Sequence, residues 1–262
     1  MKKKIFIKKH IKNILTKGFT KIDNVLELKE CDKIKKISKE LFLKYKNKIK
    51  LKNPLEETIY NLHNKNKIFT KFIDHKSIIE IVKQVLSIGS YNNQEHIILR
   101  LSAVRNPQKG FAQQLHNDSR ICGSRNPMII QVIWLLDDFN LDNGATRIVP
   151  KSHLKDSFPK QNKKYPNEKL LLAKKGSVIL LNGAMWHGSA KKTTTQDRWG
   201  MIFSYSRWFL KTSFDFNKNT PLKIYNKLNK YQKELLGFKF NPPKDEFTRG
   251  STRSKKPEKP LN

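Results

Sequence analysis

The chain has 262 residues and a formal net charge of +32, from 54 lysines and arginines against 22 aspartates and glutamates. This length suits one large domain with a substantial core, and no apolar run approaches the roughly 18 residues of a membrane span. Lysines interrupt the N-terminus before the apolar core of a signal peptide can form, which argues against secretion. Two cysteines, Cys31 and Cys122, are too few for a disulfide framework, so we expect a cytoplasmic protein.

The excess of positive charge has two interpretations. An anionic partner such as nucleic acid would explain it, and so would a general drift of the composition towards lysine. Nucleic-acid sites usually gather arginines and aromatic residues on one face, whereas only 9 of the 54 basic residues here are arginine and the lysines occur in every segment. We therefore do not expect nucleic acid as a partner.

Residues 1–95 are predicted to be mainly helical. An amphipathic helix that ends at Gly18 comes first, and residues 19–22 are a candidate strand. Apolar residues at three- and four-residue steps then predict helices over 31–45 and 78–86. These segments contain no chemical motif, so we expect helices that pack against the outside of a sheet.

From residue 96 the pattern changes to short strands separated by turn residues. The predicted strands cover residues 96–103, 112–118, 128–136, 146–149, 169–173, 177–181 and 199–208. Such a series predicts a mainly β fold with flanking helices, namely a double-stranded β-helix (a cupin-like jelly roll) with a helical N-terminal part.

The expected organisation is one domain over residues 1–241, with the jelly-roll core at 96–210 and a C-terminal helix, predicted over 221–236, within 211–241. The tail at 242–262 is charged and poor in large apolar residues, so it is expected to be disordered.

The segment 113–118, with the sequence Gln-Gln-Leu-His-Asn-Asp, is the first candidate for chemistry. In a strand, His116 and Asp118 project from the same face because side chains alternate. A third metal ligand must come from elsewhere, and the best candidate is His187, within residues 182–189. Two histidines and one carboxylate form the facial triad that binds non-haem Fe(II) and leaves positions open for a cosubstrate and O2.

Arg198 is a candidate for holding a dicarboxylate cosubstrate. It lies 11 residues after His187, at the start of the next predicted strand. A guanidinium pairs with both oxygens of a carboxylate and does not deprotonate, which suits the far carboxylate of 2-oxoglutarate. Lys191 and Lys192 are closer to His187 in the chain, but they lie in a predicted loop and an ammonium makes a poorer fork.

Together these residues resemble the phytanoyl-CoA dioxygenase family of Fe(II)/2-oxoglutarate-dependent oxygenases. The likeness rests on His116-Asn117-Asp118, Trp134, the run 143–153, the run 186–189 and Arg198, and extends from an opening phrase at 15–26 to a closing one at 235–237. It implies that His116, Asp118 and His187 bind iron and that Arg198 binds the distal carboxylate of 2-oxoglutarate.

The resemblance also implies cosubstrate contacts. Trp134 would stand near 2-oxoglutarate, and Thr146 would donate a hydroxyl to it. For a helping glutamine before the first histidine, the family pattern favours Gln113 while strand alternation favours Gln114, so both remain candidates. The family's usual Pro-Gly-Ser-His turn has Lys151 in place of glycine, which implies a different turn or strain.

Three residues are weaker candidates for contact with the substrate. Arg120 and Arg125 follow the metal motif and would suit an anionic group, although surface arginine is the simpler interpretation. Trp186 would line a pocket, with core packing as its alternative.

The resemblance implies hydroxylation of a small-molecule substrate with release of succinate and CO2. Asp118 occupies the position that related halogenases leave free for halide, and desaturation or ring closure remain open. A nucleic-acid demethylase of the AlkB type is a second hypothesis, but such enzymes usually carry another arginine six residues after the first, where Ser204 stands here. A non-catalytic basic jelly-roll binding module is a third, and it would be expected to have a damaged triad.

Overall fold

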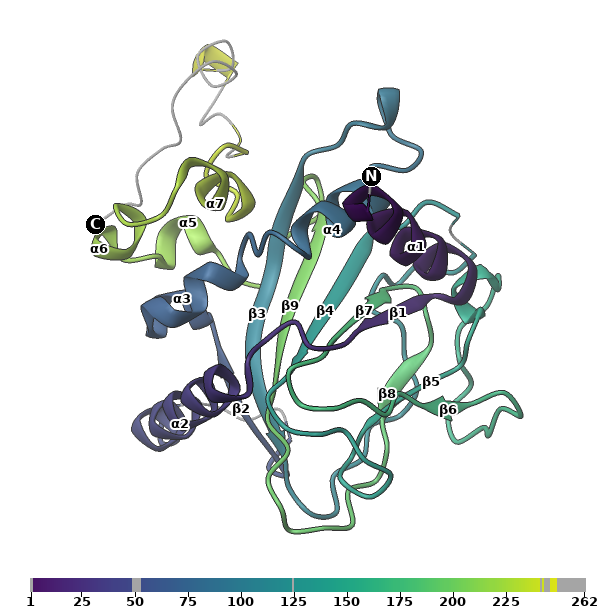
Figure 1. Ribbon diagram of the computed structural model, residues 1–262. Coiled ribbons are helices and arrows are strands. Elements are labelled where there is room, and N and C mark those ends of the chain that lie inside the picture. Colours follow the sequence, from purple (N-terminus) through teal and green to yellow (C-terminus); the bar gives the residue numbers. More distant parts are fainter. Residues whose placement is uncertain (1, 49–52, 124, 241, 243–245, 249–262) are drawn as a thin grey trace.

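The computed structural model describes residues 2–48, 53–123, 125–240, 242 and 246–248 (Figure 1). Its strands are β1 Phe19–Ile22, β2 Glu56–Tyr60, β3 Ile97–Pro107, β4 Ile129–Leu135, β5 Thr146–Ile148, β6 Lys169–Leu170, β7 Val178–Asn182, β8 His187–Ser189 and β9 Gly200–Arg207. They form a six-stranded sheet in the order β1-β7-β4-β9-β3-β2 and a three-stranded sheet in the order β6-β5-β8. Every pairing is antiparallel.

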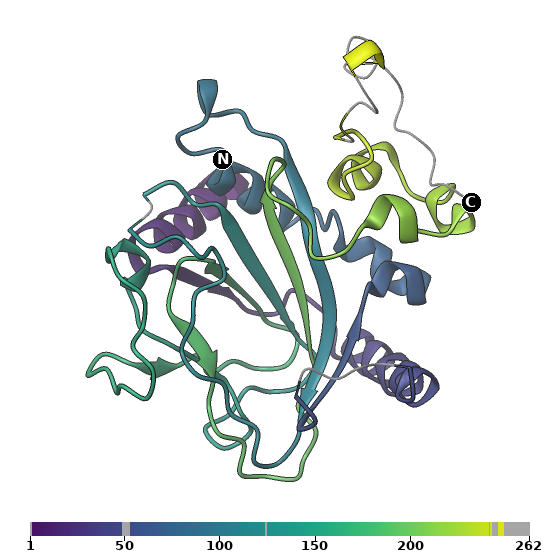
Figure 2. The same ribbon diagram turned by 180° about the vertical axis from the view of Figure 1, so that it is seen from behind.

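Helices cover the face of the large sheet that points away from the small one. They are α1 Lys2–Lys17, α2 Leu28–Tyr45, α3 Leu62–Lys65, α4 Ile79–Leu86, α5 Phe216–Asn219, α6 Leu222–Tyr225 and α7 Lys230–Leu235. Figures 1 and 2 show α1 and α4 lying across the sheet, α2 beside β2, and the three last helices near β3. In the described residues, no helix has the length and apolar character needed to span a bilayer.

Side chains of the large sheet alternate between two apolar cores. In β4, Val132 and Trp134 belong to the core beneath the helices, whereas Ile133 and Leu135 belong to the core between the two sheets. Strand β9 alternates in the same way, with its odd-numbered residues 201–205 facing the helices. Its even-numbered residues 200–204 therefore face the space between the sheets, where the site is built.

Most predicted elements are present, and the mainly β character with flanking helices is confirmed. The strand predicted over 112–118 is wrong, because in that segment only His116 forms a bridge, with His187. Strands β2 and β8 were not predicted. The helix predicted over 221–236 is divided into α6 and α7, which Asn229 separates by capping α7. The predicted tail at 242–262 lies almost entirely outside the described residues.

Candidate active site

A cavity of about 840 Å³ lies between the two sheets. Its walls come from β3, β4, β5, β8 and β9 and from the extended segment that contains His116 and Asp118. Both of these residues and His187 line it, so the structure brings the three predicted ligands to one cavity.

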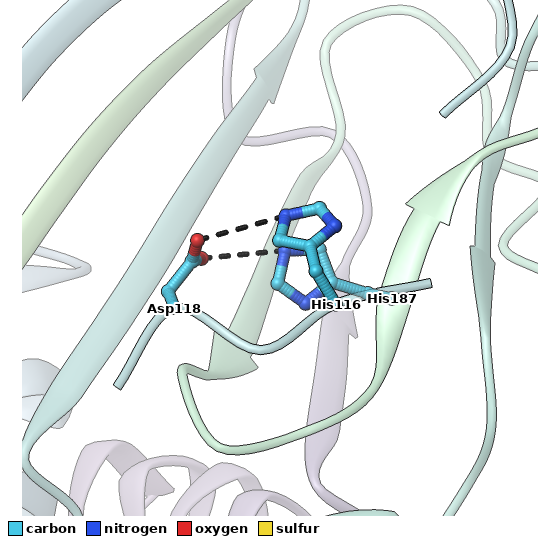
Figure 3. A group of neighbouring side chains, drawn as sticks. All are labelled: His116, Asp118 and His187. Atoms are coloured by element: carbon cyan, nitrogen blue, oxygen red, sulfur yellow. Dashed lines mark ion pairs between the residues drawn. The ribbon is translucent and has the colours of Figure 1, made fainter. Parts of the chain in front are cut away.

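The three side chains converge because two distant segments are joined by backbone hydrogen bonds. The backbone N–H groups of His116 and His187 each donate to the other residue's carbonyl oxygen at 2.9 Å. The Asp118 N–H donates to the Gly183 carbonyl oxygen at 2.7 Å. As a result, Nε2 of His116 lies 3.7 Å from Oδ1 of Asp118, and Nε2 of His187 lies 3.3 Å from Oδ2 of the same carboxylate (Figure 3). One ligand atom from each residue lies within 4.8 Å of the others, which fits a shared metal ion.

Hydrogen bonds to the backbone fix which nitrogen of each imidazole faces Asp118. Nδ1 of His116 lies 3.0 Å from the carbonyl oxygen of Gln114, and Nδ1 of His187 lies 2.8 Å from that of Met185. A carbonyl oxygen only accepts, so Nδ1 carries the hydrogen and a neutral ring presents the lone pair of Nε2. Two such lone pairs and a carboxylate meeting in one place favour a bound cation, and this is how metal-ligating histidines are commonly oriented.

The charge state of Asp118 supports this arrangement. Burial raises the pKa of its carboxyl, but His187, His116 and a hydrogen bond from Gln131 outweigh burial and hold that pKa well below its usual range. Gln131 donates from Nε2 to Asp118 Oδ2 at 2.7 Å. For His116, burial lowers the pKa of the ring. For His187, burial is outweighed by the attraction of Asp118, which raises the pKa of the ring. Asp118 therefore stays ionised, as a metal ligand must.

Arg198 lies in the same cavity just before β9 and is buried. Its Nη2 donates to the Gly144 carbonyl oxygen at 2.5 Å, and its guanidinium carbon lies 4.3 Å from the centre of the Phe139 ring. Burial lowers the pKa of Arg198 to about 10, so the group remains cationic at neutral pH. In the described part of the chain it has no ion-pair partner, which leaves guanidinium donors available to a carboxylate.

The chain matches the phytanoyl-CoA dioxygenase (PhyH) family over residues 14–200. It belongs to the phytanoyl-CoA dioxygenase family. The predicted resemblance is thereby confirmed.

Curated relatives of the chain match it in part. The uncharacterised protein Rv1501 of Mycobacterium tuberculosis is 25% identical over 149 residues, which is 56% of this chain and 55% of Rv1501. Dioxygenase trt7 of Aspergillus terreus is 29% identical over 152 residues, 54% of this chain and 51% of trt7. The chain thus spans about half the length of these relatives.

Two solved structures share its fold. HygX from Streptomyces hygroscopicus, with nickel and 2-oxoglutarate bound, gives a TM-score of 0.63 at 18% identity and covers 78% of this chain and 88% of HygX. The epimerase SnoN, in complex with Fe3+, alpha ketoglutarate and nogalamycin RO, gives a TM-score of 0.63 at 12% identity. The match covers 78% of this chain and 84% of SnoN. These likenesses confirm the predicted jelly roll.

Other residues singled out by the family pattern also line the cavity. Thr146 lies at the start of β5, opposite Ser189, a cavity residue that was not predicted. Gln113 and Gln114 both reach the cavity, and Gln114 donates to the Asn162 side chain at 2.9 Å. Arg120 lines the cavity as an exposed residue with a positive φ of 54°.

The structure contradicts the prediction for Trp134. Its indole packs edge-on against Phe72 and His75, at 4.9 and 4.8 Å between ring centres, in the core beneath the helices. Strand alternation is the reason, because Gln131 and Ile133 line the cavity and so Trp134 must point away from it.

Trp186 and Arg125 are also not among the described residues that line the cavity. Trp186 precedes His187 and turns to the opposite side, where it packs with Tyr165 at 5.0 Å between ring centres and with Val149. Arg125 is exposed, as the simpler interpretation held.

Gln131 and Ser204 are cavity residues that were not predicted as site residues. The sequence did contain a signal for Gln131, which is the one polar residue in the apolar run 129–136. Its amide reaches Asp118, so a polar residue inside an otherwise apolar strand marked the face of the strand that carries the site.

Proposed function

We propose that the protein is an Fe(II)/2-oxoglutarate-dependent dioxygenase that hydroxylates a small-molecule substrate and releases succinate and CO2. The convergence of His116, Asp118 and His187 on one point is the observation that carries the proposal. Family membership supports it, and so do the metal and 2-oxoglutarate in the solved structures of HygX and SnoN. When bound, iron with 2-oxoglutarate and O2 would supply the oxidising chemistry.

The remaining tasks fall to residues of the chain. His116, Asp118 and His187 would hold the metal from one side and leave its other positions open. Arg198 would bind the distal carboxylate of 2-oxoglutarate with the donors that the carbonyl oxygens of Asn143 and Gly144 leave free. Thr146 would add a hydroxyl donor from the wall of the same cavity.

Neither alternative function gains support from a contact in the described residues. A demethylase of the AlkB type would usually carry a second arginine at position 204, where the cavity wall presents the hydroxyl of Ser204. A non-catalytic binding module has no need of two imidazole lone pairs aimed at one carboxylate. The absence of nucleic acid as a partner and the location in the cytoplasm stay predictions.

Succinate release tests the proposal. Purified protein with Fe(II), 2-oxoglutarate and air should form succinate slowly even without substrate. Asp118→Ala removes a metal ligand and Arg198→Ala removes the carboxylate anchor, so each should lower the rate by at least about tenfold. Only Arg198→Ala should have its rate partly restored by excess 2-oxoglutarate.

Arg125→Gln is the matched control, because this exposed arginine lies outside the cavity and its loss should leave the rate unchanged. Wild-type rates in both Asp118→Ala and Arg198→Ala would contradict the proposed function.

A further inference from the structure

Arg100, in β3, lines the cavity without a counter-charge. Its Nε donates to the Lys211 carbonyl oxygen at 3.3 Å. Arg105, further along the same strand, pairs with Glu56 at 3.8 Å, whereas Arg100 forms no ion pair with a described residue. A guanidinium in this state is available to an anionic oxygen group of a ligand.

A β-bulge turns Arg100 towards the cavity. The pairing of β3 with β9 shifts between Leu99, opposite Tyr205, and Leu101, opposite Ser204, which leaves Arg100 as the extra residue. Leu99 belongs to the core beneath the helices, while Arg100 and Leu101 both line the cavity. In a regular strand two successive residues never share a face, so the bulge is what brings the guanidinium to this wall.

Polar side chains connect Arg100 with the metal ligands across the sheet. Gln131 in β4 pairs with Ser204 in β9, and Ser204 pairs with Leu101 next to Arg100. Ser204 is 1% exposed, and its Oγ has no hydrogen-bond partner in the part of the chain that the structure describes. Oε1 of Gln131 is also a buried atom without a hydrogen-bond partner among the described residues. Buried polar atoms are nearly always hydrogen-bonded to protein, water or ligand, so these two atoms in the cavity wall are available to a polar ligand.

The charges of the cavity favour an anion. Its lining includes four arginines, Arg100, Arg105, Arg120 and Arg198, and two carboxylates, Glu56 and Asp118. Glu56 pairs with Arg105, and Asp118 lies between the two imidazoles. If Arg198 takes the cosubstrate, Arg100 and Arg120 remain without an ion pair among the described residues. Of the two, Arg100 is the one whose neighbour in the strand, Leu101, pairs with Ser204.

We propose that Arg100 binds an anionic oxygen group of the substrate, a carboxylate or a phosphate, while Ser204 and Gln131 bind polar groups between that anion and the carbon to be oxidised. The inference rests on the proposed function for the metal end of the cavity. Two strand spacings of about 4.8 Å separate the backbone of Arg100 from that of Gln131, or about 10 Å. The substrate therefore carries its anionic group several bonds away from the position that reacts.

Binding of three probes that share one naphthyl ring tests this without iron or cosubstrate. Naphthyl phosphate, naphthoate and naphthol are titrated into the metal-free chain of 262 residues by isothermal calorimetry. We expect the anions to bind at least about tenfold more tightly than naphthol, because a charge-assisted contact is worth about that factor. The tighter of the two anions identifies the oxyanion that the site prefers.

Variants locate the anion. Arg100→Gln should weaken binding of the preferred anion about tenfold. Arg100→Lys keeps the charge but lacks the paired donors of a guanidinium, so its affinity should lie between those of Arg100→Gln and wild type. Arg125→Gln, an exposed arginine outside the cavity, should bind like wild type. Circular dichroism establishes that each variant is folded, and Arg100→Lys serves as the variant if Arg100→Gln is not.

Three results would overturn the inference. The first is wild-type affinity in Arg100→Gln. The second is an equal loss in Arg125→Gln, which would indicate general attraction to the basic surface. The third is a loss in Arg198→Ala with none in Arg100→Gln, which would place the anion at the cosubstrate end. A wild-type protein that releases no succinate would instead contradict the proposed function and leave these affinities standing.

Discussion

Replacing Gln131 with leucine should weaken metal binding, because the glutamine holds a metal ligand and makes no other side-chain hydrogen bond to a described residue. Its Nε2 donates to Asp118 Oδ2 at 2.7 Å, and its Oε1 has no partner among the described residues. Leucine is of similar size and removes the amide, whose Nε2 is the group that contacts Asp118. A hydrogen bond to a charged group contributes about 1.5–3 kcal/mol. The dissociation constant for metal should therefore rise by about tenfold to hundredfold, in line with the usual effect of losing such a supporting contact.

The factor by which metal binding weakens should be the same from neutral pH to about pH 5. Against the opposing effect of burial, the two histidines and the hydrogen bond from Gln131 hold the pKa of Asp118 below its ordinary value, and the metal binds only the ionised carboxylate. Wild-type protein loses this ligand only when the pH falls through that low pKa. The hydrogen bond from Gln131 is the smallest of these contributions, so in Gln131→Leu the pKa of Asp118 rises but stays low enough for the carboxylate to remain ionised down to about pH 5. Protonation of His116 and His187 affects both proteins and largely cancels in the ratio of their affinities.

Calorimetric titration of metal-free protein with Co(II), from neutral pH to about pH 5, measures the loss of affinity and its independence of pH. Gln84→Leu is the matched control, because Gln84 also donates to a carboxylate, Oε1 of Glu80 at 2.6 Å, but on the exposed surface of α4. If Gln131→Leu binds Co(II) within about twofold of wild type at every pH, a factor well below that of a supporting contact, Gln131 does not hold Asp118. The reasoning would then fail.

Two further predictions concern stability. Burial, with a smaller effect from Lys65, lowers the pKa of His63 to about 4. The unfolded chain, with a histidine pKa near about 6.5, binds the proton first, so stability falls as the pH drops from about 6.5 towards 4. His63→Gln should reduce the drop in the free energy of unfolding between pH 7 and about pH 4.5 by about 2 kcal/mol. Urea unfolding at the two pH values measures this drop, and an unchanged drop in the variant would contradict the prediction. Lys151 has a φ of 65°. Lys151→Gly should therefore raise the free energy of unfolding by about 1 kcal/mol, measured by thermal unfolding. Lys155→Gly, at a φ of −84°, should lower it instead.

The metal ligands could be predicted from sequence although part of the reasoning was wrong. Residues 112–118 form no strand, and His116 meets His187 through a single bridge. The spacing of His116 and Asp118 still brings both to one side, and the pair of backbone hydrogen bonds to His187 completes the cluster. The types and order of these residues were enough to identify the site, whereas its supporting segment depends on pairing with a distant part of the chain.

Trp134 could not be placed correctly because strand β4 is apolar on both faces. Both faces are buried, one under the helices and one towards the small sheet, so apolar residues do not reveal which face is which. Gln131 was the usable signal. Counting in steps of two from Gln131 gives Ile133 and Leu135 on the same side and assigns Trp134 to the helices, as the structure shows.

Arg100 shows where the two-residue repeat stops being sufficient. Arg100 and Arg105 are an odd number of residues apart in one strand, so regular pairing would send them to opposite faces. Arg105 faces the cavity, and the other face of β3 carries Leu99 and Val104 in the apolar core. A guanidinium forced into that core without a partner would cost several kcal/mol, so inserting one unpaired residue is the favourable solution. Two charged residues at odd spacing in a strand buried on both faces therefore predict a bulge between them. Here the shift lies between Leu99 and Leu101, at the residue that we propose recognises the substrate.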